Sequence, residues 1–161
     1  GVFMLRMKVK AVGIDRETML PVVILTDDVE ESYVPLVIGP AEANAIALVL
    51  ENVEISRPLT HDLLLSTVLA LGAKVDKVVV TDLTEDVYYA EVCLLQGEKT
   101  LRIDARPSDA IALALRSGAS IFVDEKIVPY AMVIPGEDDP ELEQFRSFLE
   151  DLSPDDFRKE N

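Results

Sequence analysis

The sequence predicts an α+β fold, in which a mixed and mostly antiparallel β-sheet packs with three main helices into a compact single domain plus a C-terminal amphipathic helix. Three observations support this expectation. The chain has 161 residues, which suits one domain, and 49% of them are hydrophobic. Short runs with period-two alternation are bounded by turn residues, and helical spacing appears at a few places between them. Aromatic residues are only 6% of the chain, so the core is expected to be aliphatic.

The first part of the chain alternates as strands do. Within residues 3–14, the polar Arg6, Lys8 and Lys10 alternate with apolar neighbours, which predicts one buried and one solvated face. The strands expected here are residues 3–14, 21–25 and 33–38, the second pairing back on the first as a hairpin. Gly39 and Pro40 then break the third strand and begin a helix over residues 40–53, since proline is favoured at the first helical position.

Two helices of similar design follow. Each comes after an Arg-Pro pair, starts at a residue with a hydroxyl group and ends at a Gly-Ala pair. We expect one helix over His61–Leu71, capped by Thr60, and another over Asp109–Arg116, capped by Ser108. The remaining elements expected are strands at 75–81, 87–95, 99–103 and 121–123 and a short helix at 124–130.

An acidic stretch separates the last helix from the rest of the chain. Gly136–Pro140 reads as a linker, and apolar residues then recur with helical spacing over Glu141–Leu152, which predicts an amphipathic helix. We expect the tail after Ser153 to be frayed. The predicted organisation is therefore a domain over residues 1–135 and an acidic linker with a C-terminal amphipathic helix over 136–161.

Cysteine content and charge restrict the compartment and the partners. The one cysteine, Cys93, cannot form an intramolecular disulfide, which is typical of a reducing compartment. The sequence shows neither a signal-peptide pattern nor an apolar run of about 20 residues, so we expect a cytoplasmic protein and no membrane contact. The formal net charge of −15 opposes nucleic-acid binding, so any such contact is expected to be local, weak and salt-sensitive.

Several common chemistries are excluded. The sequence has no P-loop, no dinucleotide-binding glycine pattern, no nucleophile elbow and no Cys/His set for zinc. Its single histidine excludes any mechanism that needs two histidines from one chain. The His61-Asp62 step therefore resembles the signature of metal-dependent phosphohydrolases only superficially.

The two Arg-Pro helix entrances are the most informative motif. One contains Arg57, Thr60 and Asp62, and the other contains Arg106, Ser108 and Asp109. The hydroxyl and carboxylate groups have a local explanation in capping and in the helix dipole. The arginines do not, because a cation sits poorly beside the positive end of a helix. We therefore weigh two interpretations, two well-made helix starts or an anion clamp in which the arginines, hydroxyls and free N–H groups hold a phosphate.

His61, Asp104 and Asp109 are candidates for chemistry at these entrances. His61 has the only side chain with an unperturbed pKa near neutral, so it could act as general base, general acid or metal ligand beside Asp62. Asp104 ends a strand and Asp109 starts a helix, where two carboxylates could hold Mg²⁺ or Mn²⁺. The alternative for this pair is capping together with an Asp–Arg ion pair.

A basic stripe on the first strand is a weaker candidate. Its members alternate along one face of the strand: Arg6, Lys8 and Lys10. In so acidic a chain they could contact nucleic acid. The alternative is a solvated edge strand whose charges protect it from aggregation.

In combination, several of these stretches resemble the bifunctional nuclease (BFN) domain family over roughly residues 4–135. The stretches are Val34–Gly39 with Glu42, Arg57–Leu63, Val75–Val78 and Ile103–Ala112. The chain departs from the family pattern at Ala43, where glycine is frequent. The resemblance implies a compact mixed domain that is commonly a homodimer and acts on both RNA and DNA. It implies as motif positions Arg57, Thr60, His61, Asp62, Asp104, Arg106, Ser108 and Asp109.

Two functions remain in consideration on the sequence. The first is a nuclease that hydrolyses phosphodiester bonds, in which Arg57 and Arg106 contact the phosphate, His61 transfers the proton, and the aspartates orient it or hold Mg²⁺ or Mn²⁺. The second is a non-catalytic regulatory domain that binds an anion or a partner with the same residues.

Overall fold

The computed structural model describes residues 3–130, 132–133 and 140–157, and it confirms the α+β class. The strands are β1 (Met4–Ile14), β2 (Pro21–Thr26), β3 (Ser32–Val37), β4 (Lys74–Thr84), β5 (Val87–Gln96), β6 (Lys99–Ala105), β7 (Ser120–Asp124) and β8 (Met132–Val133). The helices are α1 (Pro40–Leu50), α2 (Thr60–Ala70), α3 (Pro107–Ser117) and α4 (Pro140–Asp151), with 3₁₀ segments η1 (Glu125–Tyr130) and η2 (Pro154–Phe157). Nearly every predicted element is present within a few residues of its expected bounds.

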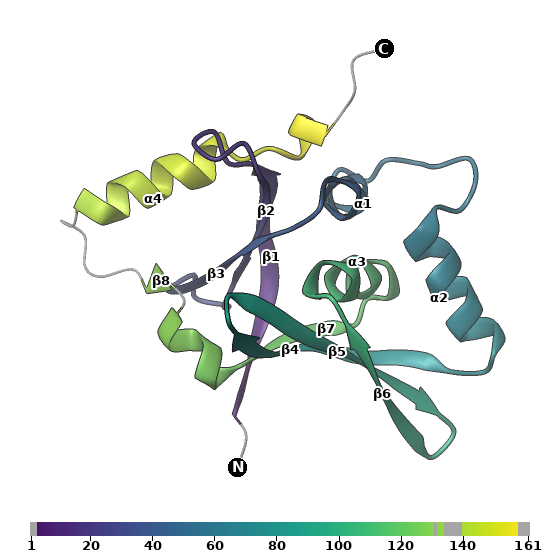
Figure 1. Cartoon of the computed structure of the whole chain (residues 1–161). Helices are drawn as coiled ribbons and strands as arrows, with labels where there is room; N and C mark the ends of the chain where they lie inside the picture. Colours follow the sequence, from purple (N-terminus) through teal and green to yellow (C-terminus); the bar gives the residue numbers. More distant parts are fainter. Residues whose placement is uncertain (1–2, 131, 134–139, 158–161) are drawn as a thin grey trace.

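The strands of this region form one sheet in the order β6-β5-β4-β7-β1-β2-β3-β8. Neighbouring strands run antiparallel, except that β4 and β7 are parallel. Figure 1 shows that β1, β2 and β3 run across the direction of β4 and β5, with α1, α2 and α3 on one side of the bend. The sheet is therefore strongly bent, and its inner face holds the core.

Strand β1 joins the two parts of this bent sheet. Residues Met4–Met7 pair with β7, whereas Lys8–Ile14 pair with β2 across a bulge between Val9 and Ala11. The interpretation of the basic stripe as part of an edge strand is therefore wrong. The alternation in the sequence shows only that β1 is half-buried. Its position inside the sheet follows from its pairing with β7 and β2, which are distant or later in the sequence.

The core is aliphatic, as expected. Alternate residues of the strands point to α1 and α3, whose inner faces are lined by small and branched side chains. The largest fully buried side chains include Ile24, Leu25, Leu36, Ile46, Ile111 and Leu113. Helix α3 is the centre of this arrangement, because every residue from Ala110 to Ala114 is buried.

Helix α4 covers the other face of the β1–β3 part. Val22 and Ile24 of β2 form a second apolar cluster with Phe145 and Leu152. The ring of Phe145 meets that of Tyr33 edge-on at 4.8 Å between centroids. The expectation of a frayed tail is wrong for residues 154–157, since η2 forms there and Phe157 packs against the main core.

The starts of α2 and α3 differ from the prediction by one or two residues. Thr60 and Ser108 lie inside their helices, and neither helix has a side-chain hydrogen bond from its N-cap residue. Proline at the first position begins α3 directly, because its fixed backbone angle suits that site. At α2, the carboxylate of Asp62 accepts the N–H of Leu59 at 2.9 Å instead.

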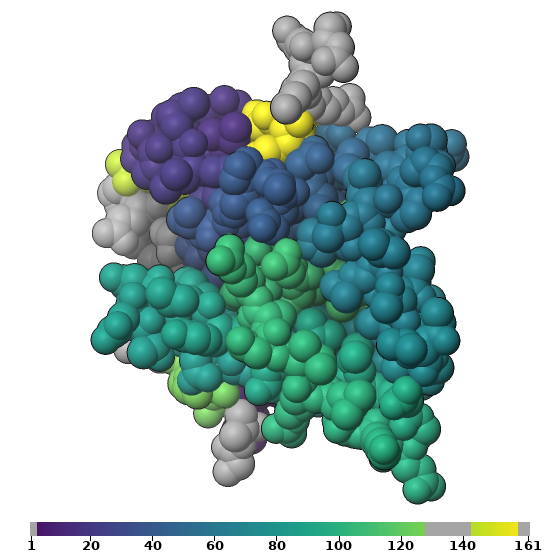
Figure 2. Space-filling view, turned by 45° about the vertical axis from the view of Figure 1, so that its right-hand side comes forward, coloured from purple at the N-terminus to yellow at the C-terminus, as the bar shows by residue number. Residues whose placement is uncertain are grey.

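Helix α2 is the least buried of the helices on the inner face. Only His61 and Val68 are buried within it, although most of its residues are apolar. Figure 2 shows the blue-green α2 next to the green β5–β6 hairpin on one face of the molecule. None of the helices in the described part of the chain is long and apolar enough to cross a membrane.

Candidate functional site

The two Arg-Pro helix entrances meet within one chain. Nε2 of His61, in the first turn of α2, lies 2.8 Å from Oδ1 of Asp109, in the first turn of α3. The His61 side chain is 10% exposed and that of Asp109 is 41% exposed. The pair therefore lies where the first turns of two helices meet, with its carboxylate partly open to solvent.

The other ring nitrogen of His61 is accessible. Asp109 is the only hydrogen-bond partner of the ring among the described residues. No buried side-chain nitrogen or oxygen in that part of the chain lacks a partner. The unpaired Nδ1 atom therefore touches solvent, although the residue as a whole is buried. When Nε2–H donates to Asp109, Nδ1 carries the lone pair and can accept a proton.

Asp62 faces a different partner from its neighbour His61. Its Oδ1 accepts a hydrogen bond of 2.9 Å from Nε of Arg116, whose side chain is only 7% exposed. The other nitrogens of Arg116 donate to the carbonyl groups of Ala112 and Ala45, each at 3.0 Å. Arg116 therefore connects α1, α2 and α3. Asp62 accepts one of its hydrogen bonds and also accepts the Leu59 N–H at the start of α2.

Sequence reasoning missed Arg116. A signal for it exists, because it lies seven residues after Asp109, which is two helical turns and the same face of α3. That face meets both His61 and Asp62 at the start of α2. The aspartates of the two motifs are thus paired across the α2–α3 interface and not with the arginines of their own motifs.

Arg57 and Arg106 remain available for a ligand. Both are exposed, and neither side chain makes a hydrogen bond or ion pair with the residues that the structure describes. Arg57 lies four residues before His61, and Arg106 is the N-cap residue of α3, three residues before Asp109. The Asp–Arg ion pair given as the alternative for Asp104 and Asp109 therefore does not form among the described residues.

The two hydroxyl groups differ in exposure. Thr60 is exposed at the start of α2, whereas Ser108 is 6% exposed under the start of α3. Because neither is used for capping, both are compatible with the anion clamp, but Thr60 is the more accessible of the two.

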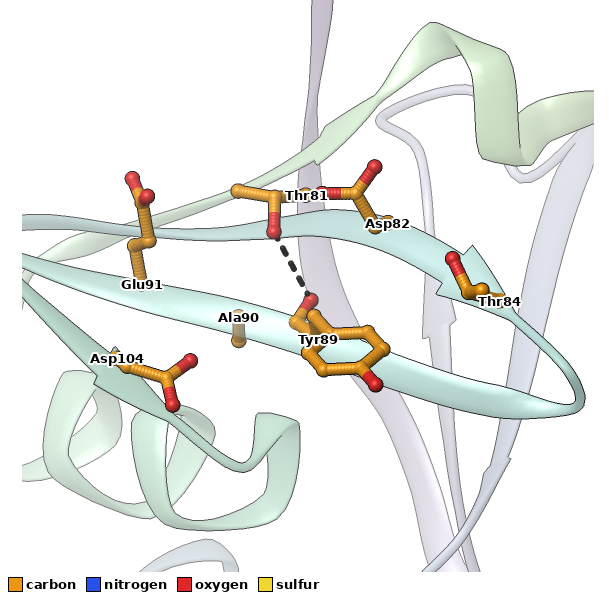
Figure 3. Close-up of a pocket in the computed structure, with 7 residues that line it drawn as sticks. All are labelled: Thr81, Asp82, Thr84, Tyr89, Ala90, Glu91 and Asp104. Atoms are coloured by element: carbon orange, nitrogen blue, oxygen red, sulfur yellow. Dashed lines mark hydrogen bonds between the residues drawn. The ribbon is translucent and has the colours of Figure 1, made fainter.

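Asp104 lies on another surface. It is directly opposite Glu91 in the β5–β6 pairing, so both side chains project to the same side of the sheet. The adjacent residues Ala90 and Val92 of β5 point into the core under α3. Asp104 thus projects away from the α2–α3 interface, into an open cavity of about 290 Å³ that contains three carboxylates. Figure 3 shows the lining residues Thr81, Asp82, Thr84, Tyr89, Ala90, Glu91 and Asp104.

The candidate metal ligands do not form one set. Asp109 bonds to His61, while Asp104 lines the separate cavity. Among the described residues, no group of three or more His, Cys, Asp or Glu side chains could hold a metal ion. These residues therefore do not fit a protein-built site for Mg²⁺ or Mn²⁺.

The basic stripe is on β1 and is separate from the helix entrances. Arg6, Lys8 and Lys10 are all exposed. Lys10 forms an ion pair of 2.7 Å with Glu30. The same sheet carries Cys93, which is buried as expected for a structural thiol, and burial raises its pKa.

Comparison with known protein families gives a clear match. A sequence model described as the bifunctional nuclease domain matches residues 23–135, which is more than half of the chain. The chain belongs to the bifunctional nuclease domain family. The resemblance noted from the motifs is thereby confirmed.

Relatives of this BFN domain are found in bacteria and plants. An uncharacterized protein of Mycobacterium tuberculosis is 39% identical over 163 residues, covering 94% of this chain and 98% of that protein. Bifunctional nuclease 1 of Oryza sativa subsp. indica is 27% identical over 109 residues, and bifunctional nuclease 2 of Arabidopsis thaliana is 29% identical over 107 residues. The matches cover 66% and 65% of this chain, and about a third of each plant protein.

The matched region contains the whole candidate site. The His61–Asp109 pair, the arginines Arg57 and Arg106, and Arg116 all lie between residues 23 and 135. The basic stripe of β1, α4 and η2 lie outside it. The BFN domain of this chain therefore has its unpaired arginines and its histidine together in the part that it shares with the family.

Proposed function

We propose that this BFN domain is a nuclease that hydrolyses phosphodiester bonds of RNA, DNA or both, at the junction of α2 and α3. The observation that carries the proposal is the contact between His61 and Asp109, which joins the two Arg-Pro motifs. The pair is a proton-transfer group with an orienting carboxylate, and two unpaired arginines belong to the same motifs. The names of the plant relatives are consistent with this activity.

In the proposed reaction, water attacks the phosphorus atom. His61 accepts a proton from that water at Nδ1, while Asp109 holds Nε2–H and stabilises the imidazolium that forms. The bond from phosphorus to the leaving oxygen breaks, and the proton is returned to that oxygen or to solvent. A site that cleaves both RNA and DNA cannot depend on the 2′-hydroxyl group as its nucleophile, since DNA has none, and water takes that place in this scheme.

Arg57 and Arg106 would hold the phosphate. A guanidinium group donates two parallel hydrogen bonds to phosphate oxygens and stabilises the charge that develops on them. Thr60, which is exposed, and the free N–H groups at the start of α2 would add donors. Asp62 has no direct part in this scheme, because Arg116 and the Leu59 N–H occupy its oxygens. It is a positioning residue for α2.

Two further features bear on substrate binding. Arg6, Lys8 and Lys10 are proposed as weak contacts for a longer strand of nucleic acid, although Lys10 already pairs with Glu30. No step of the reaction is assigned to Mg²⁺ or Mn²⁺, because Asp104 and Asp109 belong to different surfaces. The metal dependence predicted from the sequence is instead one arm of the experiment below.

A second candidate function is a non-catalytic domain that binds an anion or a partner. One observation favours it. The exposed arginines and Asp109 lie at an open helix junction and do not line the cavity of about 290 Å³. That cavity is lined by Asp104 and other residues of the sheet. The same arginines would then hold a phosphate-bearing ligand without turnover.

The test is cleavage of end-labelled single-stranded RNA, single-stranded DNA and duplex DNA by purified protein. Each substrate is incubated with EDTA, with Mg²⁺ and with Mn²⁺ at several salt concentrations. We expect cleavage that disappears in the double variant His61→Ala/Arg106→Ala and weakens as salt rises. Arg146→Ala is the matched control, since it removes an exposed cation from α4.

Equal cleavage by the wild-type protein and the double variant would show a contaminating nuclease and overturn the proposal. If there is no cleavage, but inorganic phosphate or a nucleotide raises the melting temperature and Arg106→Ala abolishes that rise, the binding function holds instead. Cleavage that survives EDTA would show that no added divalent metal is needed.

A further inference from the structure

The face of the sheet that points away from α1, α2 and α3 carries cations that the candidate site does not use. We call it the outer face. Directly paired residues of a sheet project to the same side, and the register places Cys93 of β5 between Lys77 of β4 and Arg102 of β6. The adjacent residues Val78 and Val92 point into the core. Lys77, Cys93 and Arg102 therefore lie on the outer face.

The same face continues across β7 to β1. Phe122 of β7 is paired with Arg6 of β1. Arg6 and Lys8 flank Met7, which is buried in the core, so both project to the outer side. Nζ of Lys77 lies 6.0 Å from the centre of the Phe122 ring, so the cation from β4 and the aromatic ring from β7 are neighbours. We call the four cations that cross this face the cationic row: Arg6, Lys8, Lys77 and Arg102.

The position of Cys93 supports this arrangement. The thiol is buried, and burial raises its pKa, while the charges of Lys77 and Arg102 act against this rise. Both cations therefore lie close to the thiol, one on each side. Arg6, Lys8 and Arg102 are exposed, whereas Lys77 and Phe122 are half-buried.

The cationic row has no carboxylate partners. None of its four side chains forms an ion pair or a hydrogen bond with the residues that the structure describes. Elsewhere on the surface, Lys10 pairs with Glu30 and Arg16 pairs with Asp156. The chain has 30 acidic and 15 basic side chains, so a group of unpaired cations is unusual for it. Such a group attracts an anion from outside the chain.

The carboxylates of the outer face gather at the cavity beside this row. Glu91 and Asp104 are paired across β5 and β6, and both line the cavity of about 290 Å³. Asp82 lines the same cavity and binds Nζ of Lys126 at 2.7 Å. Figure 3 shows these three carboxylates. Charge is thus segregated on this face, and a negatively charged ligand is directed to the row and away from the cavity.

We propose that the cationic row binds single-stranded nucleic acid, with phosphates on the arginines and lysines and a base or sugar on the ring of Phe122. The row crosses five strands, and a spacing of about 4.8 Å between strands gives it a length of about 20 Å. That length suits on the order of four nucleotides. A single strand fits better than a duplex, because its bases are free to contact an aromatic ring.

This surface goes beyond the proposed function, because it lies on the opposite face of the sheet from the helix junction of His61 and Asp109. The last strand of the row, β6, leads directly into Arg106 of the candidate site. One part of a longer strand could therefore be held on the row while another part reaches the site. Binding to the row does not require that the site cleaves.

The test is fluorescence anisotropy with a labelled oligothymidylate at several salt concentrations. The full chain carries His61→Ala/Arg106→Ala, which removes cleavage and part of the proposed phosphate clamp. Four phosphate contacts should give a slope of about −3 for the logarithm of the binding constant against the logarithm of salt concentration. Lys77→Ala and Arg102→Ala should each weaken binding and make the slope shallower by about 0.7. Arg146→Ala on α4 should change neither quantity.

Two further variants test the chemistry of the surface. Glu91→Gln should strengthen binding, because it removes a carboxylate next to the row. Phe122→Leu should weaken binding of oligothymidylate about fivefold or more. It should leave binding of an abasic deoxyribose-phosphate oligomer unchanged. Circular dichroism verifies that each variant is folded.

Three results would overturn the proposal. The first is no binding of oligothymidylate at low salt, and the second is a salt slope that neither Lys77→Ala nor Arg102→Ala changes. The third is equal affinity for long-chain inorganic polyphosphate together with no effect of Phe122→Leu, which would identify a surface for polyanions in general. Cleavage by the wild-type protein is assayed separately. Binding to the row without cleavage would support this inference and count against the nuclease, and cleavage without such binding would do the reverse.

Discussion

His61 and Asp109 form a hydrogen bond of 2.8 Å although 48 residues separate them in sequence. Each residue lies in the first turn of its own helix, so the contact fixes the relative position of α2 and α3. It also fixes the histidine ring, with one nitrogen on the carboxylate and the other toward solvent.

The first prediction concerns this pair. Asp109→Asn should lower kcat by about 10²–10⁴-fold, because an amide can hold the ring in the wrong tautomer and cannot stabilise the imidazolium. His61→Ala should lower kcat by a similar factor, and the double variant should have a kcat only slightly below that of either single variant. Steady-state cleavage of a labelled oligonucleotide measures this. Glu98→Gln, in the turn between β5 and β6, is the control. Additive losses in the double variant would show that the two residues do not work together.

The second prediction concerns the Arg116 junction. Arg116→Met should lower the free energy of unfolding by about 3–5 kcal/mol, because Asp62 and two carbonyl groups lose a buried partner. Arg116→Lys should also destabilise, since one ammonium group cannot reproduce three directed bonds. Urea denaturation is the measurement, with Arg146→Lys as the exposed control. A loss below about 0.5 kcal/mol for both Arg116 variants, typical of surface changes, would contradict the structural role.

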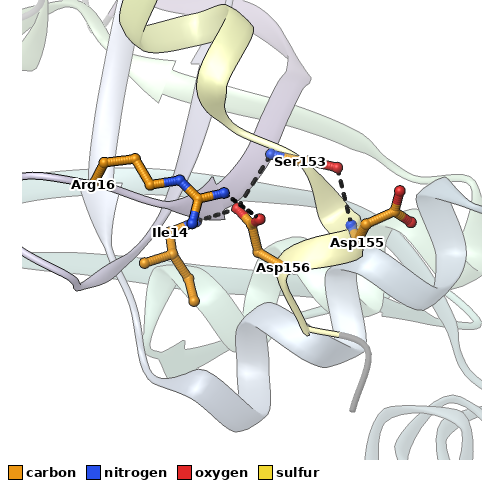
Figure 4. Close-up of polar contacts among 5 residues, drawn as sticks. All are labelled: Ile14, Arg16, Ser153, Asp155 and Asp156. Atoms are coloured by element: carbon orange, nitrogen blue, oxygen red, sulfur yellow. Dashed lines mark hydrogen bonds and ion pairs between the residues drawn. The ribbon is translucent and has the colours of Figure 1, made fainter. Parts of the chain in front are cut away.

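The third prediction concerns the docking of η2 on β1. A Cβ atom at Gly13 would lie 2.6 Å from the backbone nitrogen of Ser153, so only glycine permits this approach. Asp156 accepts the N–H of Ile14 at 2.9 Å and a hydrogen bond from Arg16 at 2.8 Å. Figure 4 shows these contacts converging on the Asp156 carboxylate.

Gly13→Ala should therefore destabilise the protein by about 1–3 kcal/mol through overpacking. Hydrogen exchange at residues 153–157 should become faster. Asp156→Asn should have a smaller effect at the same place. Gly97→Ala is the control for the place of the effect: its φ of 61° strains an alanine in the β5–β6 turn, but nothing lies within 4 Å of its Cβ position, so exchange at residues 153–157 should stay unchanged. Unchanged exchange at residues 153–157 in Gly13→Ala would refute the close approach.

The fourth prediction is a pH dependence. The hydrogen bond from Lys10 lowers the pKa of the Glu30 carboxyl below its ordinary value of 4.5. Because the folded pKa is the lower one, the ion pair stabilises the fold above about pH 4.5, and this stabilisation is lost as pH falls through the folded pKa. Both side chains are more than a third exposed, so its size is a few tenths of a kcal/mol.

Titration of the Glu30 carboxyl by NMR measures this shift directly. Lys10→Met should raise the pKa of Glu30 toward 4.5. Lys8→Met should raise it less, because the charge of Lys8 acts only at a distance. An unchanged pKa of Glu30 in Lys10→Met would contradict the ion pair.

The elements of this fold were predictable because their signals are local. Pro40 begins α1 as expected, and Gly118, with φ of 75° in the left-handed region, ends α3 as expected. One miss also has a local cause. The predicted end of α1 is late because Asn52 adopts a left-handed conformation, with φ of 52°, two residues after the helix ends.

The long-range relationships were not predictable in the same way. Nothing in the alternation of β1 shows that it pairs with both β7 and β2, and no local pattern shows that β4 and β7 are parallel. The similarity of the two Arg-Pro motifs indicated the right neighbourhood. It did not indicate that Asp109 would pair with His61 and Asp62 with Arg116, because those partners come from other helices.

The central place of β1 has a consequence for how the family is delimited. The family match begins at residue 23, after β1 and inside β2. A fragment that begins at residue 23 would lack β1, which lies between β7 and β2. It would therefore have two unpaired strand edges in the middle of the sheet. During synthesis, β1 is made before β7, so its first half can pair only after Ser120–Asp124 has left the ribosome. The edge of Met4–Met7 therefore has no partner strand until β7 has been made, and exposed strand edges are a feature through which incomplete chains associate.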